Sequence, residues 1–316
     1  MRSLSDELCV FSGNAHPDLA LKVCQYLGIP LGRAEVFKFA NDNTFVRILE
    51  NIRERDVFII QPTCAPVNDN LMELLIMIDA AKRASAGRVT AVVPYYGYAR
   101  TDKKDQPRVP ITARLVADLL TAAGADRLLT VDLHAGQIQG FFNIPVDELT
   151  ALPILVQYFR DKALDDLVVV AVDIGISKRA RDVAEHLQVP LAIVEKRREG
   201  NDSSVQSLNV IGDVTHKTVL TFDDEIDTGG SMLAAAEAVR ELGALDVYSG
   251  VTHAVLSGSA TEMVISSSLK ELVATDTVPL DKRKLDGKIT VLSVAPLLGE
   301  AINRIHKGLS VGSLFN

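Results

Sequence analysis

The sequence predicts an α/β protein of two similar domains, each built on a mainly parallel sheet flanked by helices. Short apolar runs rich in β-branched residues alternate with segments of helical spacing along the whole chain. This alternation favours parallel sheets whose strands are joined by helices. The 316 residues are enough for two domains with separate cores. In each half, a buried strand ends in acidic or histidine-containing polar residues before a helix, which is where such sheets bind ligands.

The first half is expected to contain the strands and helices of one domain. The run 56–60 is apolar and β-branched, as in a buried strand, and Asn68-Asp69-Asn70 is expected to cap a helix over 71–84. The polar stretch 95–110 has no periodicity, and a loop of that length is usually functional or disordered. The other expected elements are strands 7–12, 34–39, 88–94 and 127–133, helices 17–27 and 111–123, and a polar turn at 41–43 before the segment 44–49.

The second half repeats the alternation. The expected helices are 152–162, 177–187, 232–242, 260–267 and 296–306, the last with a proline near its start. The expected strands are 167–172, 191–195, 207–212, 219–222, 246–253, 271–275 and 289–294, with a charged loop at 196–204. We place the domain boundary near 147–153. The first domain then covers 1–148 and is joined by the C-terminal segment 296–316, and the second covers 149–295.

Composition narrows the class of protein. The net charge is −8 and the isoelectric point is near 5.3, which argues against a nucleic-acid surface because phosphate contacts need clustered Lys and Arg. Cys9, Cys24 and Cys64 are odd in number and far apart, as in a reduced cytosolic protein. The N-terminus has no apolar segment typical of a signal peptide. The apolar helix near 71–78 is interrupted by Glu73 and Asp79 and is too short to cross a bilayer. We therefore expect a cytoplasmic protein with neither nucleic acid nor membrane as a partner.

The stretch from Val219 to Ser231 has the pattern of a phosphate-binding loop. A buried strand is followed by Asp223 and Asp224, then by Asp-Thr-Gly-Gly-Ser at 227–231, then by a helix. Glycines let the backbone approach a ligand closely, and the free N–H groups at a helix start bind anions. The acids are placed to hold ribose hydroxyls or a metal. A surface turn that ends in an N-cap serine is the alternative, and the paired acids make it the weaker one.

Two further stretches are ambiguous when taken alone. The loop 98–108 combines four basic residues with Asp102 and Asp105, so it could neutralise a polyphosphate or simply be a solvated charged loop. In the stretch 130–142, Asp132 and His134 stand at the end of an expected strand, before a tight turn. A neutral imidazole can ligate a metal, although a lone histidine is more often structural.

Taken in order, these motifs resemble the ribose-phosphate pyrophosphokinase family, whose domains have the phosphoribosyltransferase fold. The likeness runs along nearly the whole chain. It rests on Asn-Asp-Asn-Leu-Met-Glu-Leu-Leu at 68–75, Tyr-Ala-Arg-Thr-Asp-Lys-Lys-Asp at 98–105, Asp-Leu-His-Ala at 132–135, Gln-Ile-Gln-Gly-Phe-Phe at 137–142, the 223–231 motif, and Ser-Val-Gly-Ser-Leu-Phe at 310–315.

The resemblance implies a reaction and its ligands. ATP and ribose 5-phosphate bind with Mg²⁺, the C1 hydroxyl of the sugar attacks the β-phosphorus of ATP, and phosphoribosyl pyrophosphate and AMP are released. The first domain would be the nucleotide side and the second the ribose 5-phosphate side. The protein would position the two substrates and neutralise the charge of the transferring phosphates. The family also forms homo-oligomers, as dimers that assemble into hexamers, so we expect a homo-oligomer here.

The resemblance also assigns roles to residues that match the family motifs. Lys196, Arg198 and His134 would be catalytic, with the two basic residues on a loop that closes over the transferring phosphates. His134 and Asp173 would hold Mg²⁺. The ATP-binding residues would be Phe39, Asn41, Asn43, Arg100, Thr101, Asp105 and His134, with Phe39 stacked on the adenine. The ribose 5-phosphate residues would be Asp223, Asp224, Asp227, Thr228, Gly229, Gly230 and Ser231.

Three positions depart from the family pattern. The pyrophosphate loop Asp-x-Gly-Gly stands here as Asp173-Ile-Gly-Ile, so Ile176 replaces the second glycine. Asn43 stands where an acid is usual, and Thr101 where glutamine is usual. Two alternatives therefore stay open. A catalytically silent regulatory relative would not need all four of His134, Asp173, Lys196 and Arg198. A phosphoribosyltransferase that uses phosphoribosyl pyrophosphate shares the 223–231 motif but does not account for the first half.

Overall fold

The computed structural model describes residues 7–171, 177–198, 206–281, 285 and 287–314, with the backbone alone for 195–198 and 206–209. The chain divides into two compact units. The first comprises Met1–Thr150, Thr277–Pro279 and Ser293–Asn316, and the second comprises Ala151–Asp276 and Leu280–Leu292. Each unit has its own sheet and its own core.

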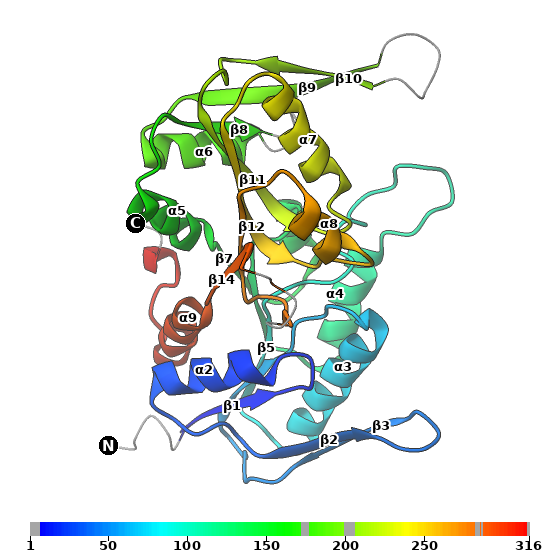
Figure 1. Cartoon of the computed structure of the whole chain (residues 1–316). Helices are drawn as coiled ribbons and strands as arrows, with labels where there is room; N and C mark the ends of the chain where they lie inside the picture. Colours follow the sequence, from blue (N-terminus) through cyan, green and yellow to red (C-terminus); the bar gives the residue numbers. More distant parts are fainter. Residues whose placement is uncertain (1–6, 172–176, 199–205, 282–284, 286, 315–316) are drawn as a thin grey trace. The chain divides into compact units, whose positions relative to one another are not determined.

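The first unit is built on a five-stranded parallel sheet in the order β1-β4-β5-β6-β7. Its strands are β1 (Leu8–Ser12), β4 (Asp56–Ile60), β5 (Arg88–Val93), β6 (Arg127–Val131) and β7 (Val146–Leu149). Figure 1 shows α3 (Val67–Arg83) and α4 (Thr112–Ala123) on one face, with α2 (Pro17–Leu27) and α9 (Ala295–Lys307) on the other. Short 3-10 turns cover Gly136–Phe141 (η1) and Gly312–Leu314 (η3).

Alternation along the strands explains the two covered faces. Val57 and Ile59 of β4 belong to the core cluster that includes Leu74 and Ile78 of α3, whereas Phe58 between them points to the opposite face and is also fully buried. Strands buried on both faces read as continuous apolar runs, which is why residues 56–60 lack an apolar and polar alternation.

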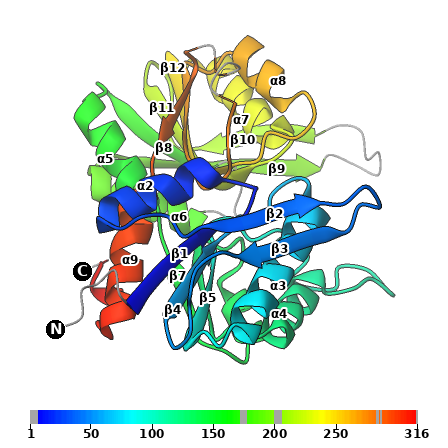
Figure 2. The same cartoon turned by 90° about the horizontal axis from the view of Figure 1, so that it is seen from below.

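A separate antiparallel hairpin, β2 (Ala34–Lys38) and β3 (Thr44–Ile48), projects from this unit. Figures 1 and 2 both show it lying alongside α3, and Val36, Val46 and Ile48 pack against the same core cluster as α3. An isolated hairpin is marginally stable in water. Its position therefore depends on its contacts with α3 and the neighbouring loops.

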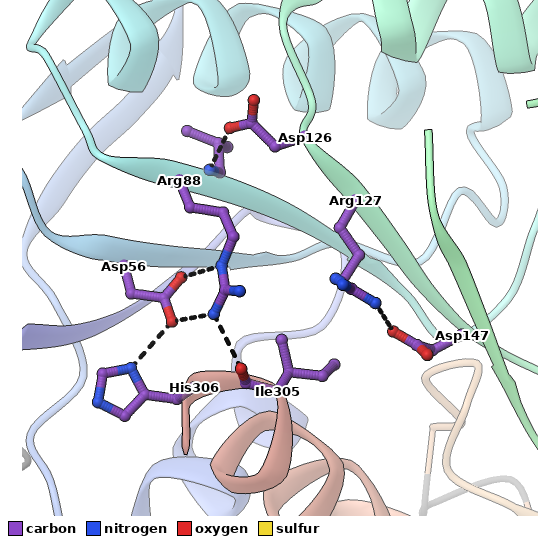
Figure 3. Close-up of polar contacts among 8 residues, drawn as sticks. Asp56, Arg88, Asp126, Arg127, Asp147, Ile305 and His306 are labelled. Atoms are coloured by element: carbon purple, nitrogen blue, oxygen red, sulfur yellow. Dashed lines mark hydrogen bonds and ion pairs between the residues drawn. The ribbon is translucent and has the colours of Figure 1, made fainter. Parts of the chain in front are cut away.

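The C-terminal helix is tied to the starts of β4 and β5 by a partly buried ion-pair cluster, drawn in Figure 3. Arg88 donates from Nε and Nη2 to the two oxygens of Asp56, at 2.8 and 2.5 Å, and from Nη2 to the carbonyl oxygen of Ile305 at 3.0 Å. His306 Nδ1 lies 2.9 Å from Asp56 Oδ2. The hydrogen bond to Asp56 raises the pKa of Arg88, and this effect is larger than the lowering of the pKa by burial. The last helix is thus part of the first unit.

The second unit has a seven-stranded sheet in the order β10-β9-β8-β11-β12-β13-β14. Its strands are β8 (Leu167–Ala171), β9 (Leu191–Arg198), β10 (Gln206–Ile211), β11 (Thr218–Ile226), β12 (Asp246–Ala254), β13 (Glu271–Thr275) and β14 (Ile289–Leu292). Only β10 runs antiparallel, against β9. The helices are α5 (Leu152–Lys162), α6 (Ser177–Leu187), α7 (Gly230–Glu241) and α8 (Ala260–Ser266).

The strand order of this sheet reverses between β8 and β11. From β8 the chain adds β9 and β10 on one side, then returns to add β11 to β14 on the other. The crevice beyond the carboxyl ends of the two central strands is the usual ligand position in such a sheet. The residues that directly follow β8 and β11 in the sequence are therefore the second unit's candidates for ligand binding.

The predicted α/β class is confirmed, and four local predictions are wrong. Strand β9 continues to Arg198, so residues 196–198 of the expected charged loop belong to the strand. Helix α3 begins at Val67, after Pro66, with no side-chain cap, because the polar residues that were expected to cap it have other partners. Strand β11 extends to Ile226 because it pairs with β12 as far as Ala254, so Asp223 and Asp224 lie within the strand rather than after it. Strand β6 ends at Val131, and the residues 132–134 belong to the turn that follows.

Candidate active-site segments in each unit

The loop after β11 forms the candidate phosphate site of the second unit. Helix α7 begins at Gly230, and Gly229 precedes it with φ = +81°, a conformation that favours glycine. Ser257 N donates to Asp227 O at 3.0 Å, which fixes the loop against the segment after β12. Ser231 lies within the first turn of α7, so the N-cap serine of the alternative interpretation is wrong; the capping position belongs to Gly229.

Exposure differs among the residues of this loop. Thr228, Gly230 and Ser231 are exposed, so the helix start and two hydroxyls face solvent. Asp223 and Asp227 are partly buried and Asp224 is buried. A Cβ atom added at Gly230 would meet no atom within 4 Å, so the space beside this backbone is open. An accessible helix N-terminus with nearby hydroxyls suits an anionic group.

In the first unit, the residues expected to bind ATP lie on three separate segments. The tip of the β2–β3 hairpin carries Phe39, Asn41 and Asn43, all of them exposed. Phe39 N donates to Asn43 O at 2.9 Å, and Asn43 N donates to Asn41 Oδ1 at 3.3 Å, which closes the turn. Phe39 is 49% exposed although its ring lies 5.5 Å from that of Phe45. One face of an aromatic cluster is thus available for stacking.

The second segment is the loop between β5 and α4. Arg100, Thr101 and Asp105 are exposed on it. Thr101 N and Oγ1 both donate to Tyr98 O, at 3.0 and 2.7 Å, so the threonine hydroxyl also closes a turn. Asp102, in contrast, is buried and accepts a hydrogen bond from Gln137 Nε2 at 2.7 Å. It joins this loop to the turn that follows His134.

The third segment is the turn after β6, where His134 is exposed. Glu148 of β7 holds this turn: its Oε1 accepts Leu133 N at 2.9 Å and its Oε2 accepts Gln139 Nε2 at 2.5 Å. Asp132 has φ = +40° and accepts from Thr150 Oγ1 at 2.9 Å. The sequence placed Asp132 beside His134 as a possible ligand, and the structure shows that it also anchors the turn.

The start of α3 connects the first two segments. Asp69 lies 2.9 Å from Lys38 Nζ at the end of β2, and Asn68 Oδ1 accepts the Tyr98 hydroxyl at 2.5 Å. Together with the bond between Asp102 and Gln137, these contacts join the hairpin, the basic loop and the His134 turn within one unit. Sequence spacing gave no sign of these links, because they join residues about 30 or more positions apart.

Three predicted residues cannot be placed by their side chains. Asp173 lies outside the described residues, as does Ile176 of the same loop. Lys196 and Arg198 lie at the end of β9, where only the backbone is described. Within the described residues, no group of three or more His, Cys, Asp and Glu side chains is arranged to hold a metal ion. In the same part of the chain, no helix combines the length and apolar character needed to cross a membrane.

A cavity of about 810 Å³ lies in the first unit, and it is separate from these segments. Its lining includes Arg53, Arg55, Asp56 and Arg88. Asp56 and Arg88 are the first residues of β4 and β5, so the cavity lies at the amino-terminal edge of the sheet. The candidate residues of the basic loop and the His134 turn follow the carboxyl ends of β5 and β6, where such sheets bind ligands.

Comparison with known proteins decides the family. A protein of Caldanaerobacter subterraneus subsp. tengcongensis named ribose-phosphate pyrophosphokinase is 55% identical over 317 residues, which cover all of both chains. This chain belongs to the ribose-phosphate pyrophosphokinase family. The pyrophosphokinase of Clostridium perfringens is 53% identical over 319 residues, covering all of this chain and 99% of that one.

Family models and a solved structure agree with this membership. Residues 8–124 match the N-terminal domain of ribose phosphate pyrophosphokinase, and residues 203–316 match the phosphoribosyl synthetase-associated domain. The crystal structure of phosphoribosylpyrophosphate synthetase from Mycobacterium smegmatis superposes with a TM-score of 0.91 at 45% identity, covering 96% of this chain and 99% of that one. The resemblance first drawn from the motifs is therefore confirmed at the level of the pyrophosphokinase family and its fold.

Proposed function

We propose that this chain is an active ribose-phosphate diphosphokinase. It transfers the β,γ-pyrophosphoryl group of ATP to the C1 hydroxyl of ribose 5-phosphate and releases phosphoribosyl pyrophosphate and AMP. The observation that carries the proposal is the loop 227–231 at the strand-order reversal of the second sheet, in a chain that matches pyrophosphokinases over its full length. That loop offers exposed backbone N–H groups at the start of α7 to a sugar phosphate.

The second unit is proposed to bind ribose 5-phosphate. Gly229 and Gly230 let the backbone approach the 5-phosphate, and the hydroxyls of Thr228 and Ser231 add donors. Asp223, Asp224 and Asp227 form the acidic group on the ribose side of this loop. Asp223 and Asp227 are the more accessible of these acids, so we assign them the direct contacts and give buried Asp224 a supporting part.

The first unit is proposed to bind ATP. Phe39 stacks on the adenine with its exposed ring, while the amides of Asn41 and Asn43 lie at the same turn to meet polar edges of the nucleotide. Arg100 neutralises phosphate charge from the basic loop. Thr101 and Asp105 complete the nucleotide contacts. All of these residues are exposed, as a site that opens to solvent before substrate arrives requires.

Catalysis is proposed to rest on His134, Lys196 and Arg198. The two basic residues stand where β9 leads into the 199–205 segment, and their charges would neutralise the transferring phosphates. His134 and Asp173 would hold Mg²⁺ that binds together with ATP. Mg²⁺ usually keeps several waters and is bound by one or two carboxylates together with substrate phosphates. When bound, the metal neutralises developing phosphate charge.

The substrates suggest where and how the protein works. Both are small charged metabolites, and we propose a cytoplasmic enzyme that acts on them without nucleic acid or membrane. We also propose that it works as a homo-oligomer, a hexamer built from dimers. Light scattering at working concentration tests the assembly, and a monomeric mass would contradict it.

One assay tests the reaction. Purified protein is incubated with ATP, Mg²⁺ and ribose 5-phosphate, and AMP is measured with and without the sugar. AMP that depends on the sugar supports the proposal. Its absence at every phosphate concentration would support a silent regulatory relative. Release of pyrophosphate from phosphoribosyl pyrophosphate in the presence of a nucleobase would instead support a phosphoribosyltransferase.

Replacement of His134 tests the proposed catalytic role. His134→Ala should lower turnover by about two to four orders of magnitude with the fold intact. His186→Ala is the matched control, because His186 is an exposed histidine at the end of α6 that is outside the proposed machinery. A His134→Ala variant with normal turnover would overturn the role assigned to this residue.

A further inference from the structure

Glu73 is a buried carboxylate that the reaction itself does not use. It lies in the middle of α3 and is only 8% exposed. Its Oε1 accepts Asn14 N at 2.6 Å and Gln61 Nε2 at 2.8 Å, and its Oε2 accepts Asn14 Nδ2 at 2.8 Å. Within the described residues, the three groups that donate to this carboxylate are neutral N–H groups. Burying a charge is costly unless hydrogen bonds compensate for the lost water. The Glu73 carboxylate is therefore stable in this place only while the three donors stay in position.

Gln61 fixes the same arrangement from the sheet. It is fully buried directly after β4, its Oε1 accepts Ala15 N at 3.0 Å, and its Nε2 also donates to Asn70 O at 3.3 Å. A Cβ atom at Gly13 would lie 2.3 Å from Gln61 Oε1, so the loop after β1 passes close over this side chain. The loop 13–15 is therefore bound at successive residues to α3 and to the end of β4.

Asn14 transmits this arrangement to the hairpin. Its Nδ2 donates to Glu73 Oε2 and also to Val36 O of β2, at 3.2 Å. Val36 is three residues before Phe39, the ring proposed to stack on adenine. The hairpin is a two-stranded sheet with no other strand beside it in the described chain, so contacts of this kind set its position.

We propose that Glu73 is a positioning residue for ATP, which acts through Asn14 to hold β2 and thereby the nucleotide-stacking turn. The inference rests on the proposed function. It extends that function to residues that do not touch substrate. The chemical requirement is specific: one amide group must donate to a carboxylate and to a carbonyl at the same time.

Glu73→Gln breaks this requirement with almost no change in volume. The introduced amide can keep one oxygen toward Asn14 N and Gln61, but it then points its NH₂ group at Asn14 Nδ2, donor against donor. If Asn14 turns over to accept that bond, its oxygen faces Val36 O, acceptor against acceptor. Either arrangement loses the bond to the hairpin or to the helix.

The kinetic test uses AMP release with each substrate varied in turn. Glu73→Gln and Asn14→Ala should each raise the KM for ATP about tenfold, which is about 1.4 kcal/mol, with kcat and the KM for ribose 5-phosphate within about twofold of wild type. The double variant should be no worse than the single ones, because both act through the same bond. Asp79→Asn, which removes an exposed acid from the same helix, is the control and should leave both KM values unchanged.

A second test does not depend on activity. The chain contains no tryptophan, so Phe37→Trp places the protein's single tryptophan on the hairpin, where Phe37 is 45% exposed. Excitation at the red edge of the absorption band, where tyrosine does not absorb, reports this residue alone. Adding Glu73→Gln to this background should increase acrylamide quenching of the tryptophan in the absence of ligand, and adding Asp79→Asn should not.

The outcomes separate the inference from the proposed function. If the wild-type protein releases no AMP, the proposed function fails, and the quenching experiment still tests whether Glu73 holds the hairpin. If the wild type is active but the KM for ATP does not change, or if both KM values rise together, the positioning role is wrong. Unchanged quenching in the Glu73→Gln background would equally overturn it.

Discussion

The hydrogen bond between Gln137 and Asp102 offers a sharp test of how the nucleotide-side segments are joined. Gln137 Nε2 donates to Asp102 Oδ2 at 2.7 Å, and Asp102 is buried whereas Gln137 is exposed. Gln137→Glu places a second carboxylate against the first. The basic loop should then separate from the turn that carries His134, and AMP release should fall.

The size of the expected loss in kcat/KM depends on the exposure of residue 137. A hydrogen bond to a charged group is worth about 1.5–3 kcal/mol. Because residue 137 is exposed, the introduced glutamate can turn into solvent and avoid most of the repulsion, so the cost approaches the lower end. About 1.5 kcal/mol corresponds to a roughly tenfold drop in kcat/KM for ATP. The drop should exceed any change in the KM for ribose 5-phosphate, which is proposed to bind the other unit.

The reciprocal variant is the decisive control. Combining Gln137→Glu with Asp102→Asn reverses the donor and the acceptor and restores a charged hydrogen bond at the same place. This double variant should recover most of the lost kcat/KM. Wild-type kinetics in Gln137→Glu, or a double variant no better than the single one, would refute the idea that this contact positions the loop.

Three further predictions concern the free energy of unfolding and the reactivity of the cysteines. Burial alone would raise the pKa of Glu271, but hydrogen bonds from Thr290, Tyr158 and Lys162 lower it overall, so Glu271→Gln should destabilise the protein in urea by about 1.5 kcal/mol at pH 7. The difference should shrink as pH falls below about 4.5, where the carboxyl of the unfolded chain takes up a proton, and vanish below the lower pKa of the folded state; a pH-independent difference would contradict this. Burial raises the pKa of Cys24 to about 12 and of Cys64 to about 11, so iodoacetamide at pH 8 should label them only after urea is added, as mass spectrometry of the native protein can check. Gly229→Ala should lower the free energy of unfolding in urea by about 1–2 kcal/mol, because alanine is strained at the positive φ of this position. A steric clash would not contribute, since a Cβ atom there meets no atom closer than 3.6 Å. An unchanged unfolding midpoint would show that the strain is absent.

The fold class was predictable because burial on both faces of a parallel sheet leaves a direct mark on the sequence. Runs such as residues 56–60 and 167–171 are apolar without alternation, and the structure buries them in central strands. The start of α3 was not predictable in the same way. Asn68 and Asp69 look like capping residues, but their side chains bind Tyr98 and Lys38, so the helix begins one residue before Asn68 without them.

The motifs indicate where the candidate polar groups lie along the chain, but not which residues support them. Those of the first sheet follow strands β5 and β6, and those of the second lie at the end of β11 and in the loop after it, near where open sheets bind ligands. Glu73, in contrast, reads as a polar interruption of an apolar helix, and its partner Asn14 lies 59 residues earlier. Spacing along the chain carries no information about such a pair, because only the packing of α3 against the loop after β1 brings the two together.

The two departures from the family pattern that the structure describes, Asn43 and Thr101, both lie in turns closed by hydrogen bonds. Asn43 closes the hairpin through its own backbone N and O, so the loss of an acid there leaves the turn intact and removes only a charge beside the proposed adenine contact. Thr101 closes its turn through a backbone N and a hydroxyl, which a glutamine side chain could replace only in part. A change at position 43 therefore bears on which nucleotide is preferred, whereas a change at position 101 also bears on the shape of the basic loop. These two effects are separable, since the first alters relative KM values among nucleotides and the second alters kcat/KM for all of them.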